Sequence, residues 1–193
     1  VRLVLELKSV DYTEERPPGG TYRSEDYRRL VAAGSVPAIE INGTILHDSD
    51  AIVELLEDLF PKPAMRPDDP LERAFLKSVT RFHDTRLEPA LRSLFPMVGN
   101  SDKTQSAALA VDAMNGHLER LDRLISPRPY LGGEALSLAD CAYATTLFMM
   151  EDIASCMNLE ARFSEKIHHW RNTLHHTDTV KEIIDQNRSA IAD

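Results

Sequence analysis

The stretch GSVPAIEINGTILHDSDAI, residues 34–52, joins a proline-led apolar run to a polar cluster at the start of a helical pattern. The runs VPAIEI and TILH predict two short strands. Asn42-Gly43 between them is a pair typical of a two-residue hairpin turn. The following SDAIVELLEDLF predicts an amphipathic helix, with Ala51, Ile52, Leu55, Leu56 and Leu59 on one side.

Two features of this stretch have both a structural and a functional interpretation. Proline cannot donate to a strand ladder, so a trans Val36–Pro37 bond would simply begin the strand. A cis bond would instead turn the backbone and expose its polar groups to a ligand. Asp48 or Ser49 can cap the following helix. The same helix start suits a ligand carboxylate, and Asp48 suits a ligand ammonium.

The bulk composition predicts a globular protein that binds neither nucleic acid nor membranes. The chain has 193 residues, of which 42% are hydrophobic and 27% charged, enough for one large domain or two small ones. Its formal net charge of −9 argues against non-specific nucleic-acid binding, which needs a basic face. No apolar run is long enough to predict a transmembrane helix. The charged beginning VRLVLELKSV is not typical of a signal peptide, so we expect a cytoplasmic protein.

The proline-rich stretch FPKPAMRPDDP marks a change in composition and predicts a domain boundary. We expect an α/β domain over residues 1–60, a linker over 61–70 and an all-helical domain over 71–193.

Within the first domain, VRLVLELKS predicts a helix, VDYTEER a strand and PPGGT a loop. SEDYRRLVAAG predicts a helix capped by Ser24 and stopped at Gly34. Five helices are expected in the second domain, over residues 71–95, 102–125, 137–156, 164–174 and 177–187.

The segment VPAIEINGTILHDSDAI resembles the glutathione-binding segment of the cytosolic glutathione transferase family. The family pattern is Val-Pro, a strand, a turn, a second strand, then an acidic residue or Gln, Ser, any residue, Ala and Ile. Asp48 replaces the commoner Glu or Gln, and the matching residues are Val36, Pro37, Asp48, Ser49, Ala51 and Ile52.

The resemblance continues over nearly the whole chain. VRLVLELKSVDYTEE resembles the first helix and second strand of the family's thioredoxin-like domain. LFPKPAMRPDDPLERA resembles the interdomain connection, and FHDTRLEPALR resembles the fourth helix. YLGGEALSLADC matches a capping motif of the family through Gly133, Ser137, Ala139 and Asp140. Ser137 and Asp140 are expected to form a capping box, to which we assign no catalytic role.

The resemblance implies a thioredoxin-like N-terminal domain followed by an all-helical C-terminal bundle. It implies glutathione as co-substrate, a small electrophile as second substrate and a homodimer. The Val36–Pro37 bond should be cis, with the Val36 backbone pairing with the cysteinyl backbone of glutathione. Asp48 and Ser49 should hold the γ-glutamyl end.

The sequence departs from the family pattern in two places. Family members begin with a strand and a loop that carries a catalytic Ser, Tyr or Cys. We expect that residue upstream of Val1, in residues that the given chain lacks. Relatives also carry Asn-Pro and then Lys or Gln ahead of Val-Pro, where this chain has Val31, Ala32, Gly34 and Ser35. The glycine carboxylate then needs another partner, such as Arg28 or Arg29.

Four side chains are candidates for a second-substrate cleft: Phe82, His83, Arg86 and Tyr143. They can line an open, partly apolar cleft with one positive charge, suited to an electrophile or an acidic substrate. Alternatively, Phe82 is a core residue and Arg86 an ion-paired surface residue.

No metal site is predicted. Two pairs of histidines occur near the C-terminus, but no carboxylate or cysteine completes a ligand set, so we interpret them as surface residues: His168, His169, His175 and His176. Cys141 and Cys156 are interpreted as buried residues without a chemical role.

Two functions follow from the resemblance. The first is an enzyme that binds glutathione and activates its thiol for attack on an electrophile, with isomerisation or thiol exchange as related activities. The second is a non-catalytic member of the same fold, used for binding or assembly. A trans bond at Pro37 would instead favour an unrelated helical protein with a thioredoxin-like module.

Overall fold

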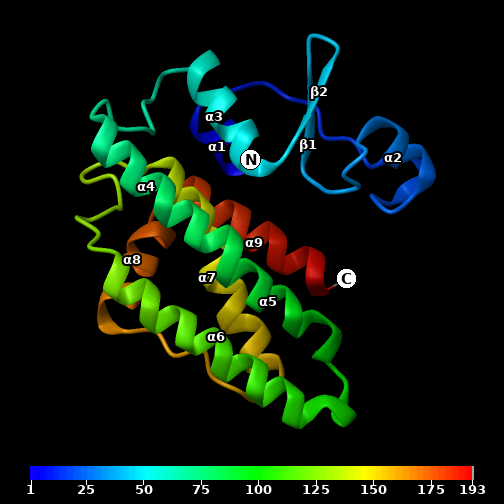
Figure 1. Ribbon diagram of the computed structural model, residues 1–193, viewed down its shortest axis with the longest axis vertical. Helices are drawn as coiled ribbons and strands as arrows, with labels where there is room; N and C mark the ends of the chain where they lie inside the picture. The colour runs from blue at the N-terminus through cyan, green and yellow to red at the C-terminus, as the bar shows by residue number, and fades with distance from the viewer. Residues whose placement is uncertain (193) are drawn as a thin grey trace. The chain divides into compact units, whose positions relative to one another are not determined.

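The computed structural model describes residues 1–192, with side chains described as far as residue 189. Contacts divide the chain into two compact units, Val1–Met65 and Arg66–Asp193. The elements of the first unit, labelled in Figure 1, are α1 (Arg2–Leu7), the 3₁₀ turn η1 (Pro18–Gly20), α2 (Glu25–Leu30), β1 (Ala38–Ile41), β2 (Thr44–His47) and α3 (Ser49–Leu59).

The predicted hairpin is confirmed. Strands β1 and β2 pair antiparallel, with Ala38 opposite His47 and Ile41 opposite Thr44. Asn42 and Gly43 have φ angles of 51° and 77°. A type I′ turn requires positive φ at both central residues, and asparagine and glycine adopt it most readily.

The strand predicted over VDYTEER is wrong. Residues 10–16 form no regular element, and residues 11–16 are exposed. Without a buried face, this polar segment has no apolar surface to stabilise strand pairing. Among the described residues, β1 and β2 form a two-stranded sheet.

A buried ion pair joins α1 to α3 and to the segment that leaves the first unit. The Lys8 ammonium lies 2.7 Å from a Glu57 carboxylate oxygen and donates to the carbonyl oxygens of Phe60 (2.7 Å) and Pro63 (2.9 Å). The other Glu57 oxygen accepts from the Met65 N–H at 3.0 Å. The ammonium therefore has two hydrogen bonds and an ion pair, and of the two carboxylate oxygens one accepts a hydrogen bond and the other lies in the ion pair.

Helix α2 begins as predicted but ends earlier. The Ser24 hydroxyl accepts from the Tyr27 N–H, which confirms the cap. The helix ends at Leu30, and Val31 is its C-cap residue. Gly34 lies beyond this end, with a φ of +59° in the loop before β1.

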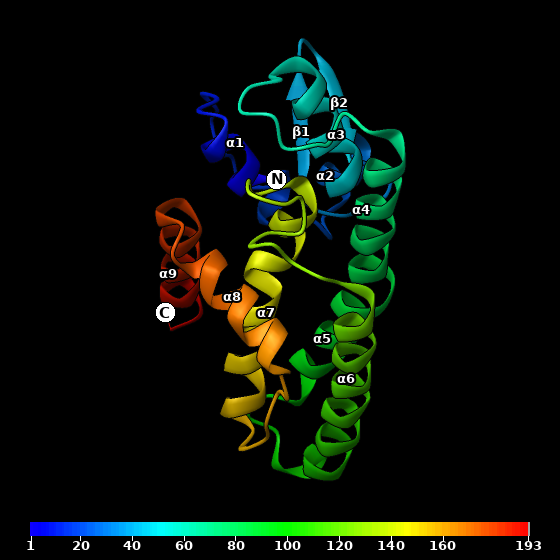
Figure 2. The ribbon, with the colours of Figure 1, turned by 90° about the vertical axis from the view of Figure 1, so that its left-hand side faces the viewer.

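The second unit consists of helices. They are α4 (Pro70–Phe82), the π-helical turn η2 (His83–Leu87), α5 (Glu88–Leu94), the 3₁₀ turns η3 (Phe95–Met97) and η4 (Ser101–Lys103), α6 (Thr104–Leu124), α7 (Leu138–Cys156), α8 (Glu165–His175) and α9 (Asp178–Ala192). Figures 1 and 2 both show α6 running beside the α4–α5 segment. The core of this unit includes Leu94, Leu118, Leu147 and Trp170, all nearly inaccessible to solvent.

The predicted helix over residues 71–95 is interrupted by the π turn. The Glu88 N–H donates to the His83 carbonyl five residues back. Pro89 explains the change, because it has no N–H for the Thr85 carbonyl and its ring would clash there in an α-helix. The Arg86 guanidinium donates to that carbonyl instead, at 2.9 Å.

The predicted capping box begins α7. The Ser137 hydroxyl accepts from the Asp140 N–H, and the Asp140 carboxylate accepts from the Ser137 N–H at 2.9 Å. The same carboxylate accepts from the Leu131 N–H (3.0 Å) and the Trp170 indole (2.8 Å). The pKa of Asp140 lies above its usual value because burial raises it, and these hydrogen bonds offset part of that rise. Asp140 therefore ties α8 and the preceding loop to α7.

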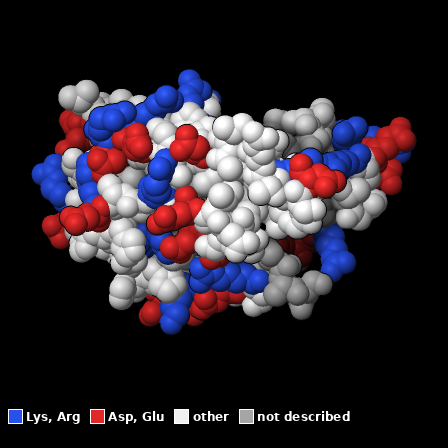
Figure 3. Space-filling model, turned by 90° about the horizontal axis from the view of Figure 1, so that it is seen from below, with Lys and Arg blue, Asp and Glu red and all other residues white. Residues whose placement is uncertain are grey.

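The described residues contain no helix with the length and apolarity of a membrane span. No group of three or more His, Cys, Asp or Glu in that part of the chain is arranged to hold a metal. On the face drawn in Figure 3, basic and acidic side chains are interspersed rather than separated into two regions.

Candidate functional site

The hairpin brings the two predicted binding motifs to one end of the sheet. Because Ala38 lies opposite His47, the residue before β1 and the residue after β2 are neighbours. Those residues are Pro37 and Asp48. Val36-Pro37 and Asp48-Ser49 are therefore brought together by strand register.

Val36 presents its backbone at this end. The Val36–Pro37 peptide bond is cis, as expected. Val36 as a whole is 47% exposed. Within the described chain, neither its N–H nor its C=O has a hydrogen-bond partner. A ligand with an extended peptide backbone can pair with both groups.

Asp48 caps α3 from an unusual backbone conformation. One oxygen, Oδ1, accepts from the N–H groups of Asp50 (3.0 Å) and Ala51 (3.3 Å). The φ and ψ angles of Asp48 are 78° and 115°, a region that costs a non-glycine residue about 1–3 kcal/mol. The second oxygen, Oδ2, has no partner among the described residues, which leaves it free for a ligand ammonium.

Ser49 is the first residue of α3, and it is exposed. Asp48, rather than Ser49, supplies the cap. The Ser49 hydroxyl and N–H are therefore unoccupied within the described chain. Both groups belong to the first residue of the helix, where the backbone dipole favours negative charge. A carboxylate can accept from both groups.

Arg28 lies beside the chain that leads into Val36. Its Nε atom is 3.2 Å from the position a Cβ would occupy on Gly34, and its stem is almost as near. The Tyr27 hydroxyl donates to the Ser35 carbonyl at 2.7 Å and ties α2 to the same segment. Arg29 instead pairs with Glu25 and Asp26 of its own helix. Of the two predicted arginines, Arg28 is the one without a carboxylate partner in the described chain.

The structure divides the four second-substrate candidates into two pairs. His83 and Tyr143 are buried in the helical unit, with their rings 5.0 Å apart. His83 contacts the Thr146 hydroxyl at 2.8 Å. The Tyr143 hydroxyl donates to the Val79 carbonyl at 2.8 Å, and burial raises the pKa of Tyr143. The contacts of His83 fix the π turn to α7, and the bond to Val79 fixes α4 to the same helix.

The other pair lies towards α6. Phe82 is half-buried with its ring edge-on to the His117 ring, at 6.4 Å between centroids. Arg86 is exposed, and its charge reaches the same histidine. Arg120 lies one turn further along α6, 3.5 Å from His117. Sequence reasoning missed His117 and Arg120, although their spacing on a predicted helix places them on one face.

The two cysteines and the four histidines near the C-terminus are half-buried or exposed. Cys156 is exposed and Cys141 half-buried, so the prediction that both are buried is wrong. His168, His169 and His176 are exposed, whereas His175 is half-buried against Phe148.

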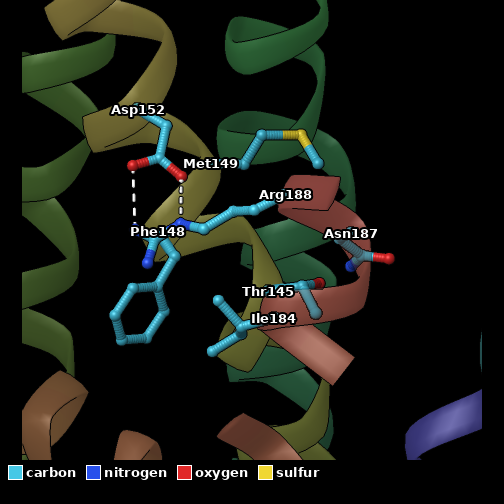
Figure 4. A pocket seen from close by; sticks show the side chains of 7 residues that line it. All are labelled: Thr145, Phe148, Met149, Asp152, Ile184, Asn187 and Arg188. Atoms are coloured by element: carbon cyan, nitrogen blue, oxygen red, sulfur yellow. Dashed lines mark hydrogen bonds and ion pairs between the residues drawn. The ribbon is translucent and has the colours of Figure 1, made fainter. Parts of the chain in front are cut away.

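A shallow pocket between α7 and α9 was not predicted. It is a depression whose empty space of about 260 Å³ includes open solvent. Figure 4 shows its lining: Thr145, Phe148, Met149, Asp152, Ile184, Asn187 and Arg188. Arg188 donates twice to Asp152, at 2.8 and 2.9 Å. The two charges of the pocket are thus committed to each other, so we assign it no ligand.

Comparison with known proteins identifies both units. Residues 1–64 match the family model "Glutathione S-transferase, N-terminal domain". Residues 104–172 match the model "Glutathione S-transferase, C-terminal domain".

Two relatives show the range of names among similar proteins. Maleylacetoacetate isomerase of Rattus norvegicus is 30% identical over 151 residues, which are 75% of this chain and 68% of the rat protein. A stringent starvation protein A homolog of Haemophilus ducreyi is 29% identical over 153 residues, which are 79% of this chain and 69% of the relative.

The fold has close counterparts among solved structures. A theta class glutathione S-transferase of Xanthomonas axonopodis pv. citri, with glutathione bound, has a TM-score of 0.78 and 22% identity. The match covers 93% of this chain and 87% of that one. The predicted fold, a thioredoxin-like domain followed by a helical domain, is confirmed. The matched domains and the isomerase relative together show that this chain belongs to the glutathione S-transferase family.

Proposed function

We propose that this chain binds glutathione at the end of the hairpin and presents its thiol to a small electrophile. One observation supports this most directly. The pairing of Ala38 with His47 brings together several polar groups that have no hydrogen-bond partner in the described part of the chain. The Val36 backbone, the second Asp48 oxygen and the Ser49 hydroxyl are all available there. Each matches one part of an extended γ-glutamyl tripeptide.

The γ-glutamyl end carries an ammonium and a carboxylate. Asp48 receives the ammonium through its free oxygen, because opposite charges at hydrogen-bond distance attract strongly. Ser49 and the start of α3 receive the carboxylate. The cysteinyl backbone then pairs with Val36, as a strand added to the hairpin would.

The glycine end extends towards the chain before Val36. Arg28 reaches this region across Gly34, and a guanidinium matches a carboxylate in shape and charge. Arg28 therefore takes the place of the Lys or Gln that relatives carry ahead of Val-Pro.

Chemistry at the thiol requires a donor that lowers its pKa, so that the thiolate attacks an electrophilic carbon. The family resemblance implies a Ser, Tyr or Cys in this role, and we assign the role to no residue of this chain. The rat relative is named an isomerase. Reversible addition of a thiolate to a double bond, followed by bond rotation, is thus one form of the proposed reaction. Phe82 and Arg86 remain the proposed contacts for the second substrate.

Isothermal titration with glutathione tests the proposal. We expect saturable binding to the wild-type chain and about tenfold weaker binding to Ser49→Ala, since a hydrogen bond to a charged group is worth about 1.5–3 kcal/mol. The matched control is Ser78→Ala, a helical serine whose hydroxyl donates to the Phe75 carbonyl. Equal affinity in Ser49→Ala and wild type would contradict the assignment.

A second candidate function is non-catalytic binding or assembly in the same fold. It is favoured by Gly34 and Ser35, which replace the Lys or Gln of many relatives. A similar protein carries the name stringent starvation protein A homolog. A protein that fails to bind glutathione would support this alternative. We also propose that the protein is cytoplasmic and that it forms a homodimer. Sedimentation of the purified protein tests the homodimer.

A further inference from the structure

Two asparagine–glycine pairs occur in the chain, Asn42-Gly43 and Asn115-Gly116. Such a pair is chemically labile, because glycine has no side chain to shield its backbone nitrogen and that nitrogen can attack the preceding side-chain amide. The attack needs an amide that is free of hydrogen bonds and a backbone that can rotate. The two pairs differ in both respects.

The pair on α6 is held in place. Asn115 is only 3% exposed. Its Nδ2 donates to the Glu160 carbonyl at 3.0 Å, and its Oδ1 accepts from the Arg162 N–H at 2.8 Å. Gly116 lies in the interior of α6, where helical hydrogen bonds fix the backbone. Neither the amide nor the glycine nitrogen is therefore free to react.

The pair in the hairpin is open. Asn42 and Gly43 are both exposed. Apart from Gly43 and its two neighbours in the chain, no atom lies within 4 Å of the position that a Cβ on Gly43 would occupy. In the described part of the chain, neither the Asn42 amide nor the Gly43 N–H has a hydrogen-bond partner. The pairing of Ile41 with Thr44 closes the turn, so the Gly43 nitrogen lies outside the ladder.

The closed turn limits the rate of attack. In a type I′ turn the nitrogen of the second central residue points away from the side chain of the first. The attack therefore requires rotation about the Cα–C bond of Asn42, which opens the turn. Within the described residues the sheet has two strands, and the end of such a hairpin opens locally at a small cost in free energy.

We propose that Asn42 is a site of spontaneous deamidation, which converts it to isoaspartate and aspartate. The Gly43 nitrogen attacks Asn42 Cγ and forms a new N–Cγ bond. The Cγ–Nδ2 bond breaks, and the proton of the Gly43 nitrogen leaves with Nδ2 as ammonia. Water then opens the resulting succinimide ring. Opening at Cγ gives aspartate, and opening at the main-chain carbonyl gives isoaspartate. Water is the co-reactant, and nothing is oxidised or reduced.

The isoaspartyl product alters the hairpin. Its main chain runs through the former side chain and so carries an additional carbon, which a two-residue type I′ turn does not accommodate. We expect the β1–β2 ladder to weaken from the Ile41–Thr44 end. The same ladder brings Pro37 to Asp48, so deamidation should also weaken glutathione binding. This last consequence alone rests on the proposed function.

Peptide mass spectrometry of aged protein tests the modification. The folded protein is incubated at mildly alkaline pH, which deprotonates more of the backbone amide, and is digested at acidic pH to avoid further reaction. We expect the peptide with Asn42 to gain the mass of an NH₂-to-OH exchange, with isoaspartate identified by electron-transfer fragmentation. The peptide with Asn115 is the internal control. Its reaction should be at least about tenfold slower, since two hydrogen bonds must break first. An unchanged Asn42, or equal rates at the two sites, would overturn the proposal.

The variant Asn42→Gly tests the effect on the hairpin. Gly-Gly suits a type I′ turn, and the variant has no amide to lose at this position. ¹H–¹⁵N correlation spectra of both proteins are compared before and after ageing, and circular dichroism confirms that each is folded. We expect the amides of Ile41 and Thr44 to change with age in wild type and to stay constant in the variant. Isoaspartate that forms without any change in the strand amides would contradict the proposed opening. Neither measurement depends on whether glutathione binds.

Discussion

Ala38 lies directly opposite His47 in the β1–β2 hairpin, and this pairing determines where the proposed ligand contacts meet. Moving the register by one residue would reverse the faces of the side chains along the strand. It would also separate Val36 from Ser49. The proposed site therefore depends on the Asn42-Gly43 turn as much as on the residues that touch the ligand.

Asp48 has two separable roles, which its variants should distinguish. Asp48→Asn retains an acceptor for the Asp50 and Ala51 N–H groups but loses the negative charge. We expect it to keep most of its stability and to bind glutathione about tenfold more weakly, because the charged hydrogen bond to the ammonium is lost. Urea denaturation and calorimetric titration measure the two effects.

The backbone of Asp48 gives a further comparison. Asp48→Ala loses the cap, at about 0.5–2 kcal/mol, and keeps the positive φ of 78°. Asp48→Gly also loses the cap but relieves the backbone strain. We therefore expect the glycine variant to be more stable than the alanine variant in urea. The reverse order would contradict the strained conformation.

Ser49 should affect binding and leave folding unchanged. Its hydroxyl takes no part in capping α3, so Ser49→Ala should alter the unfolding free energy by less than about 0.5 kcal/mol. The loss in glutathione affinity should then appear without a loss in thermal stability. A large drop in the melting temperature would show that the hydroxyl has a structural role instead.

The Lys8–Glu57 pair predicts a strong coupling between two buried residues. Lys8→Met leaves the Glu57 carboxylate buried without its ammonium partner, and such a change costs about 3–5 kcal/mol. Replacing Glu57 by Gln in that background should recover part of the loss, since the uncompensated charge is removed. Urea denaturation of both single variants and the double variant measures the coupling.

The exposed pair Arg29–Glu25 is the control for this cycle. Exposed ion pairs contribute about 0–1 kcal/mol, so Arg29→Gln should change stability little. Strictly additive effects of the Lys8 and Glu57 substitutions would contradict the buried pairing.

His117 predicts a pH dependence of stability. Burial and the nearby arginines lower its pKa below the usual 6.5 in the folded protein, so the unfolded chain binds the proton more tightly. As the pH falls through 6.5, the unfolded chain is protonated first and the unfolding free energy decreases. The decrease continues until the lowered folded-state pKa is passed.

Replacing His117 should remove this part of the pH dependence. The unfolding free energies of wild type and His117→Gln are measured in urea between pH 7.5 and 5. If wild type is the more stable of the two at pH 7.5, the two free energies should converge as the pH falls. A difference that stays constant over this range would contradict a lowered pKa.

Local sequence signals predicted most of the secondary structure. Asn42-Gly43 indicated the hairpin because few other pairs adopt two positive φ angles, and the Ser137 and Asp140 spacing indicated the capping box. The resemblance predicted Val36, Pro37, Asp48 and Ser49 as site residues, and this stays a prediction. The structure adds which groups of these residues are already occupied.

The misses arose from contacts distant in sequence. Nothing in the pattern of residues 71–95 specified a π turn, because Thr146 and Tyr143, which contact its first residue His83, lie on α7. The burial of Glu57 likewise depends on Lys8, 49 positions earlier by residue number. The segment over residues 10–16 looked like a strand because local propensity carries no information about whether a face is buried.

The most direct test of the glutathione site is a titration of isotope-labelled protein with glutathione, followed by ¹H–¹⁵N correlation NMR. We expect saturable shifts centred on the amides of Val36, Ser49 and Asp50, with a smaller effect at Gly34 beside Arg28. Ser49→Ala should weaken the binding that all of these shifts report. Saturable shifts confined to the helical unit, or no saturable shifts at all, would contradict the proposed glutathione site.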